Sequence, residues 1–80
     1  MPYFYFIWTA AKVRHLAENG VTAQEFEDVV NWPVEHIISR TTGRPGVIGY
    51  TRAGRRLVAF YERIDEATLE PVMAYDDESR

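Results

Sequence analysis

The chain has 80 residues, of which 46% are hydrophobic, enough for one small domain over residues 1–80 and too few for a second. It contains no cysteine, which excludes a disulfide framework, a cysteine nucleophile and a thiolate zinc site. A net charge of −3 with 26% charged residues is typical of an ordinary soluble protein. The apolar stretch at residues 3–8 is much shorter than a membrane span and lacks the features of a signal peptide. We therefore expect no membrane association and a cytoplasmic location.

The N-terminal part of the chain predicts one strand followed by two helices. Residues 3–8 form an unbroken aromatic-rich run, typical of a largely buried strand. Thr9 can cap a first helix, and Gly20 can end it with a left-handed backbone conformation. Thr22 and Glu25 have the spacing of a capping box, which predicts the start of a second helix. A Trp-Pro pair ends this helix, because proline disfavours helical backbone in the residue before it.

The rest of the chain predicts consecutive strands joined by short turns. These strands are expected over residues 36–40, 47–52, 56–64 and 69–75. Gly54 favours a tight hairpin turn, and Pro71, which cannot donate to a ladder, is expected at an edge, a bulge or the start of pairing. Residues 76–80 are expected to form a frayed acidic tail. The predicted fold is α+β: an N-terminal strand and two helices, then an antiparallel meander with the helices on one face.

Alternation along the predicted strand 56–64 divides its side chains between two faces. The face with Val58, Phe60 and Ile64 is expected to pack under the helices. The opposite face is bounded by arginines and is expected to be open; it carries Arg55, Leu57, Ala59, Tyr61 and Arg63. Leu57 and Ala59 are also suitable for burial, which leaves the assignment open at these two positions.

The charges are distributed unevenly along the chain. Residues 1–39 carry two basic and five acidic residues, and residues 57–80 carry two and seven. Between them lies a block without acids that has five arginines: Arg40, Arg44, Arg52, Arg55 and Arg56. Such a block is often simply a solvated edge, but the planar guanidinium fork also suits phosphate or carboxylate. The block therefore indicates a solvated edge, a site for a polyanion, or a site for an acidic partner chain.

Other chemical motifs are missing from the sequence. The recurring glycines at 43, 46 and 49 are not followed by a lysine and a hydroxyl residue, so they do not form a phosphate-binding loop. His15 and His36 lie on different predicted elements without a nearby run of ligands. The two serines lack the glycine-flanked turn of a hydrolase nucleophile. The sequence therefore predicts neither a metal site nor a cofactor.

Arginine with tyrosine on a sheet is one arrangement that can cleave RNA without a metal. The nucleophile is the 2′-hydroxyl of the substrate, so the protein orients it, transfers protons and stabilises charge on the phosphate. Arginine supplies positive charge, while tyrosine can transfer a proton or stack on a base. Tyr61 and Tyr75 are the candidates on the predicted strands, although packing at a sheet edge explains tyrosines there equally well.

Several short motifs, in their order and spacing, resemble the BrnT-like toxins. They are Phe6-Ile-Trp8, His15, Asn19-Gly20-Val21-Thr22 with Glu25, Gly43-Arg44, and Thr51-Arg52-Ala-Gly54-Arg55 with Leu57. The resemblance extends from about residue 5 to about residue 75. It implies a RelE-like fold and a ribonuclease toxin of a type II toxin–antitoxin pair, with a cognate antitoxin encoded alongside that occludes the toxin.

The chain departs from the family pattern at two places. The last strand of BrnT-like chains usually ends in a serine-alanine-arginine run before a basic helix, whereas here Tyr75 takes the place of the arginine and acids follow. Asn19 stands where the family usually has a lysine-histidine pair before the glycine. Because acidic residues beside an RNA site are electrostatically unfavourable, we expect RNA binding to be weak and cleavage to be reduced or lost.

The sequence thus predicts a set of site residues for RNA cleavage. Arg52 and Arg55 are expected to hold the phosphate, with Tyr75 as the proton-transfer or stacking group. Further RNA contacts are expected from Arg40, Arg44, Tyr61, Lys12 and His15. The alternative is an interaction module without catalysis, whose arginine-rich sheet face binds an acidic protein partner or a second copy of the chain.

Overall fold

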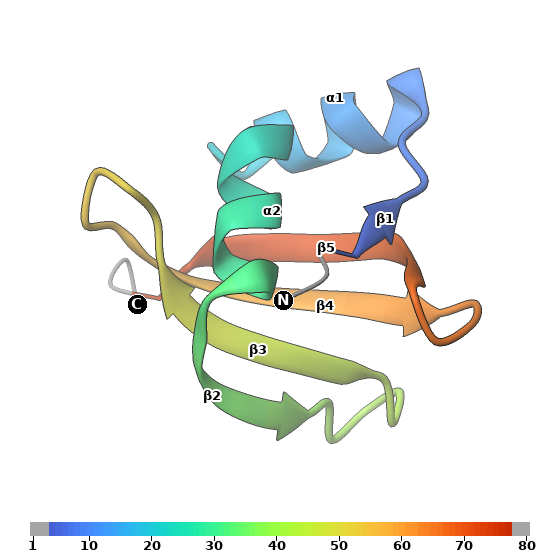
Figure 1. Cartoon of the computed structure of the whole chain (residues 1–80). Helices are drawn as coiled ribbons and strands as arrows, with labels where there is room; N and C mark the ends of the chain where they lie inside the picture. The colour runs from blue at the N-terminus through green and yellow to red at the C-terminus, as the bar shows by residue number, and fades with distance from the viewer. Residues whose placement is uncertain (1–3, 78–80) are drawn as a thin grey trace.

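The computed structural model describes residues 4–77 and has the predicted α+β architecture (Figure 1). In chain order the elements are β1 (Tyr5–Phe6), α1 (Ala10–Glu18), α2 (Ala23–Asn31), β2 (Pro33–Ile38), β3 (Pro45–Tyr50), β4 (Arg56–Arg63) and β5 (Thr68–Asp76). One five-stranded sheet has the order β1-β5-β4-β3-β2. Strands β2 to β5 form the predicted antiparallel meander, while β1 pairs in parallel with β5. The sheet is therefore mixed, with one parallel pair of strands and three antiparallel pairs.

Both helices begin and end where the sequence predicts. The Thr9 side chain accepts a hydrogen bond from the Lys12 amide at 3.1 Å, and Gly20 has a positive φ of 76° after the end of α1. At the start of α2, Thr22 Oγ1 accepts from the Glu25 amide at 3.1 Å, and Glu25 Oε1 accepts from the Thr22 amide at 3.0 Å. This reciprocal capping box satisfies two amides that a helix end would otherwise leave unpaired.

Strands β2 and β3 begin and end earlier than predicted, at residues 33–38 and 45–50 instead of 36–40 and 47–52. Strand β2 begins at Pro33, three residues before the predicted start, because the same proline that ends α2 can be the first residue of a strand. Strand β1 is limited to Tyr5–Phe6, and Tyr5 is exposed, so the prediction of a long buried strand over residues 3–8 is wrong for the described residues. The ring of Phe6 instead packs edge-on against Phe26 of α2.

Pro71 lies beside a bulge, one of the positions that its missing amide predicts. Tyr61 of β4 pairs with Pro71, whereas the preceding Phe60 pairs with Met73, so Val72 is an extra residue in β5. The bulge reverses the alternation along β5. As a result, Leu69 and Pro71 on one side of it and Ala74 on the other all face the helices and are fully buried.

The faces of β4 are opposite to those predicted. Leu57, Ala59 and Tyr61 are buried in the core cluster under the helices, whereas Phe60 is only half-buried on the other face. Val58 is buried as predicted, at 3% exposed, but it is not part of that cluster. Ile64 is exposed beyond the end of β4. The prediction took Arg55 as the mark of an open face, but the structure turns this arginine toward α2.

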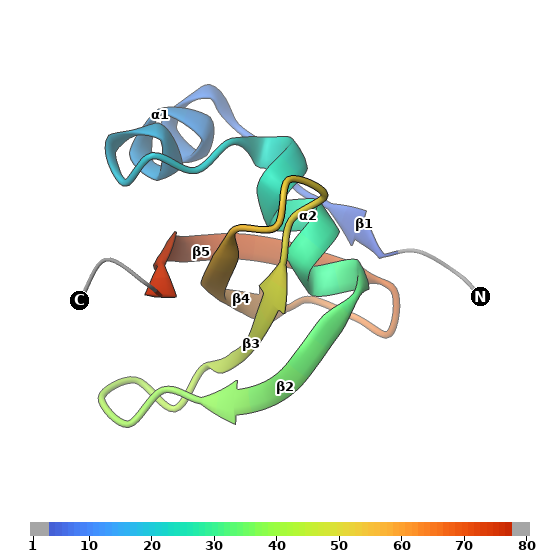
Figure 2. The same cartoon turned by 90° about the vertical axis from the view of Figure 1, so that its left-hand side faces the viewer.

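The helices leave one face of the sheet uncovered. Helix α2 packs against β3 and β4, and α1 packs against β5. In the view of Figure 2 both helices lie on the same side of the sheet, and the loop between β2 and β3 extends beyond the sheet away from α1. No helix among residues 4–77 is long and apolar enough to cross a membrane.

The beginning of the predicted acidic tail is part of the fold. Asp76 is the last residue of β5 and pairs with Arg55, and Asp77 pairs with Arg56. The prediction of a frayed tail is therefore wrong for these two residues, because arginines on the neighbouring hairpin bind their carboxylates. Residues 78–80 of that tail lie outside the described part of the chain.

Candidate binding groove on the helix-free face

A groove of about 420 Å³ lies on the helix-free face of the sheet. Phe60 on β4 and Met73 and Tyr75 on β5 contribute one wall, and the β2–β3 loop contributes the other. Ile38 at the end of β2 lines this second wall together with the loop residues Ser39, Arg40, Thr41, Thr42 and Arg44. The groove therefore joins aromatic and apolar side chains from the sheet to hydroxyl and guanidinium groups from a loop.

A glycine in β3 makes room for the groove wall. Gly46 pairs with Phe60 across the β3–β4 ladder. A Cβ atom at position 46 would lie 2.5 Å from Phe60 Cδ1 and 2.8 Å from the Ala59 carbonyl oxygen. The ring of Phe60 therefore occupies the space that a side chain at position 46 would need.

The groove contains two arginines with different partners. Arg44 Nε donates to Glu62 Oε2 at 3.0 Å, so its charge is balanced at the rim of the sheet. Within residues 4–77, Arg40 makes no ion pair and its side chain is exposed. Arg40 is consequently the cation of the groove that remains available to a ligand.

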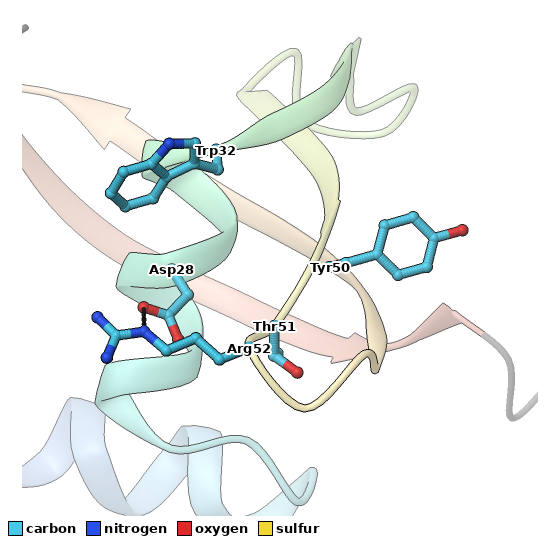
Figure 3. Close-up of a pocket in the computed structure, with 5 residues that line it drawn as sticks. All are labelled: Asp28, Trp32, Tyr50, Thr51 and Arg52. Atoms are coloured by element: carbon cyan, nitrogen blue, oxygen red, sulfur yellow. Dashed lines mark ion pairs between the residues drawn. The ribbon is translucent and has the colours of Figure 1, made fainter.

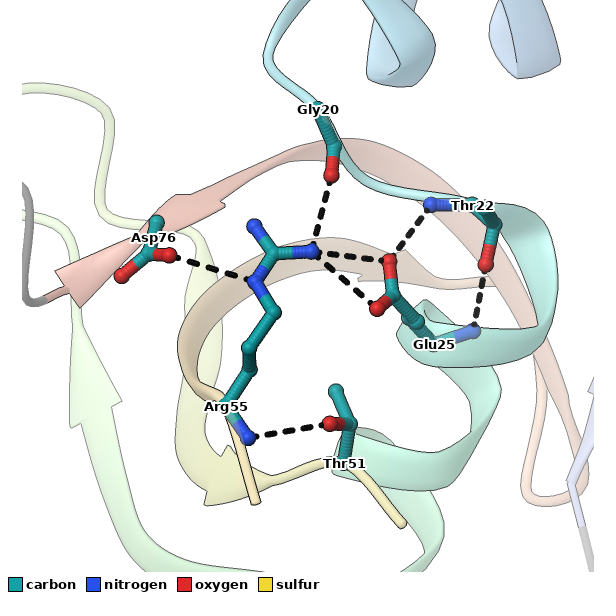
Figure 4. A network of polar contacts seen from close by, with 6 residues as sticks. All are labelled: Gly20, Thr22, Glu25, Thr51, Arg55 and Asp76. Atoms are coloured by element: carbon teal, nitrogen blue, oxygen red, sulfur yellow. Dashed lines mark hydrogen bonds and ion pairs between the residues drawn. The ribbon is translucent and has the colours of Figure 1, made fainter. Parts of the chain in front are cut away.

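Arg55 is held in a network on the helix-covered side of the molecule (Figure 4). Its Nη1 donates to Gly20 O at 2.9 Å and to both carboxylate oxygens of Glu25 at 3.1 Å, and its Nε donates to Asp76 at 3.2 Å. Burial lowers the pKa of the guanidinium, but the hydrogen bond to Asp76 and the charge of Glu25 outweigh it, so the pKa is raised above its ordinary value. Glu25 also accepts from the Thr22 amide, which links this network to the capping box of α2.

Arg52 lies at a second cavity, of about 320 Å³, between α2 and the β3–β4 turn (Figure 3). Its Nε lies 3.4 Å from Oδ1 of the buried Asp28, while the arginine side chain is 80% exposed. Gln24 donates to the same carboxylate oxygen at 3.0 Å. Trp32 and Tyr50 also line the cavity, but in Figure 3 the Tyr50 ring points away from it.

The structure therefore brings together only part of the predicted site. Arg40, Arg44 and Tyr75 line the groove, but Arg52 and Arg55 do not, so the three predicted catalytic residues do not share one cavity. Tyr61 is only 6% exposed and belongs to the core, so it does not lie on the open face where the sequence placed it. The reason is the reversed face of β4.

Lys12 and His15 lie on α1, on the other side of the sheet from the groove. His15 is exposed, with Nδ1 4.0 Å from the Glu18 carboxylate of the same helix. Because Lys12 and His15 lie on the helix side of the sheet, neither is placed to assist Tyr75 in the groove. Phe60 and Met73 line the groove but were not predicted as site residues. A correct assignment of the two faces of β4 would have placed Phe60 on the open face. The face of Met73 depends on the bulge in β5, which the sequence pattern did not locate.

Four of the five arginines of the block form ion pairs within the chain, and Arg40 is the exception among the described residues. Arg44 pairs with Glu62, and Arg52 pairs with Asp28. Arg55 pairs with both Glu25 and Asp76, and Arg56 pairs with Asp77. The hydrogen bonds of Arg56 to Asp77 and to the Tyr50 hydroxyl raise its pKa above the ordinary value. The acids come from the segments on either side of the block, so a charge pattern that is uneven in sequence becomes balanced in space. Among the described residues, no group of three or more histidines and acids is placed to hold a metal ion.

Comparison with protein-family models, with curated proteins and with solved structures finds no match in any of the three. The α+β fold and the groove on its helix-free face are therefore the features from which a function is argued.

Proposed function

We propose that this chain is a protein-binding module whose helix-free groove takes a segment of a partner protein with apolar and acidic side chains. The observation that supports this most is the commitment of four arginines of the block to carboxylates of the same chain. A phosphate would have to compete with these ion pairs, and RNA would also approach Asp76 and Asp77 near Tyr75. The groove itself offers an apolar wall and a single available cation, Arg40, which suits a protein segment better than a polyanion.

The resemblance to BrnT-like toxins makes a cognate antitoxin the expected partner. In this proposal the chain binds an antitoxin as a toxin of this family does. Tyr75, in place of the final arginine of the family, accompanies the loss of RNA cleavage. The partner segment packs on Phe60 and Met73 and places a carboxylate against Arg40.

Binding to the product of a neighbouring gene tests the proposal. The affinity is measured by calorimetry for the wild type, for Arg40→Glu in the groove, and for Arg14→Glu on the exposed surface of α1 as a matched charge reversal. We expect Arg40→Glu to weaken binding at least tenfold and Arg14→Glu to leave it within twofold. Equal affinities for the three proteins, or no binding by the wild type, would overturn the proposal.

Metal-independent RNA cleavage in the groove is the second candidate, and the common cavity of Tyr75 and Arg40 favours it. In this proposal the Tyr75 hydroxyl transfers a proton and Arg40 holds the phosphate. Unstructured RNA is incubated with the protein in the presence of a chelator, with Tyr75→Phe as the variant and a deoxyribose at the scissile position as the substrate control. Cleavage that survives the chelator and is lost in both controls would establish this candidate, whereas intact RNA would exclude it.

A further inference from the structure

Strand β2 ends the sheet and has an unpaired outer edge. It lies last in the strand order, and in both Figure 1 and Figure 2 no other segment of residues 4–77 runs along its outer side. Among its side chains Val34 and Ile38 are 62% and 66% exposed. An exposed edge with apolar side chains is a template for pairing with another strand.

The hydrogen bonds of the β2–β3 hairpin show which backbone groups face outward. The Ser39 amide donates to Arg44 O at 2.9 Å, which fixes the phase of the ladder at the end of β2. Pairing then runs regularly from Ile38↔Pro45 back to Glu35↔Ile48. Because inward and outward backbone groups alternate along an antiparallel strand, the N–H and C=O of His36 and Ile38 point away from β3.

We propose that two copies of this chain associate by antiparallel pairing of their β2 strands about a two-fold axis at His36. In this register His36 lies opposite His36 of the second copy, Ile38 opposite Val34, and Glu35 opposite Ile37. The two sheets thereby become one continuous sheet, and the exposed Val34 and Ile38 side chains are brought into cross-strand pairs. Figure 1 shows the edge in question at the lower side of the sheet.

The length and charge of β2 favour this register over its neighbours. A two-fold axis at Ile37 would overlap only residues 36–38 of the strands, whereas the axis at His36 overlaps residues 34–38. An axis at Glu35 would overlap as many residues but would place two glutamates directly opposite each other, which is destabilising. Val34 is the extra residue of the irregular pairing between Pro33 and Glu35, so its pair with Ile38 stands at the end of the overlap, and the segment from 35 to 38 is regular.

Single cysteines test the register directly, since the natural chain has none. In His36→Cys the two Cα atoms are expected about 5.5 Å apart, within the range of about 4.4–6.8 Å that a disulfide bridges. Ile38→Cys is the matched control: position 38 is exposed on the same face, but in this register its two copies are about 13 Å apart. Mild oxidation is followed by non-reducing electrophoresis, and circular dichroism of the reduced proteins confirms that both variants are folded.

We expect His36→Cys to form a covalent dimer and Ile38→Cys to remain at least tenfold less crosslinked. Sedimentation of the unmodified protein at about 100 µM is the second measurement, in which Val34→Lys is expected to weaken dimerisation at least tenfold. Equal crosslinking of both cysteine variants, crosslinking of neither, or a strictly monomeric unmodified protein would overturn the inference. Ile38 belongs to both the outer edge of β2 and the groove, whereas Val34 lies outside the groove lining, so Val34→Lys tests self-association separately from partner binding at Arg40 and either proposal can fail alone.

Discussion

Replacement of Arg55 by alanine should destabilise the fold, because this arginine connects three parts of the chain. It bonds to Gly20 after α1, to Glu25 at the start of α2 and to Asp76 at the end of β5. The substitution leaves the two carboxylates without this cation and removes the donor to the Gly20 carbonyl. The sequence prediction of a phosphate-binding Arg55 concerned only the loss of cleavage in this variant.

The size of the effect follows from the exposure of the groups involved. The side chain of Arg55 is 34% exposed, and those of Glu25 and Asp76 are 22% and 26% exposed. Charge-assisted hydrogen bonds contribute about 1.5–3 kcal/mol when buried, and exposed ion pairs about 0.2–1 kcal/mol. With about 1 kcal/mol for each of the two partly exposed carboxylates, Arg55→Ala should lower the free energy of unfolding by about 2 kcal/mol.

Equilibrium unfolding in urea measures this loss. For a small domain with a denaturant slope of about 1 kcal/mol per molar, the midpoint should fall by about 2 M. Arg40→Ala is the control: its side chain is exposed and makes no ion pair among the described residues, so its loss should cost less than about 0.5 kcal/mol. An Arg55→Ala protein as stable as the wild type, or an equal loss from Arg40→Ala, would refute the structural role of Arg55.

Two further predictions concern a glycine of the groove and a hairpin turn. Gly46→Ala should lower the free energy of unfolding by about 1–3 kcal/mol, because the added Cβ meets the Phe60 ring and the Ala59 carbonyl oxygen; an unchanged urea midpoint would contradict this close packing. In the β4–β5 turn, the amide of Ala67, the neighbouring Thr68 and the charge of Arg63 lower the pKa of the Asp65 carboxyl. A carboxyl with a lowered folded-state pKa stabilises the fold above its unfolded-state pKa, and this contribution is lost as the pH falls through the folded-state value. Asp65→Asn should therefore unfold at lower urea than the wild type at neutral pH, and the difference should disappear as the pH falls through the lowered folded-state pKa of Asp65; a difference that does not change as the pH is lowered from neutral into the acid range would contradict the role of the carboxylate.

Local signals determined the order of the elements and the ends of the helices. Thr9, Gly20 and the Thr22–Glu25 box act within a few residues of themselves, so their effect is readable in the sequence and is present in the structure. The glycine turn at 54 belongs to the same class, with a φ of 89°. Such features predict an α+β chain of one strand, two helices and a meander without any knowledge of distant contacts.

Tertiary structure decided which face of the sheet is covered and what the arginines do. Leu57, Ala59 and Tyr61 could be assigned to either face by alternation, and only the packing of α2 selects the buried one. The arginine block has no acid near it in sequence, yet Glu25 and Asp76 reach Arg55 across 30 and 21 residues of chain. Ion pairs between distant segments leave no local signal, because their geometry exists only after the helices and the sheet have packed together. The same packing leaves Arg40 as the available cation beside Tyr75, which no reading of the five arginines in sequence could single out.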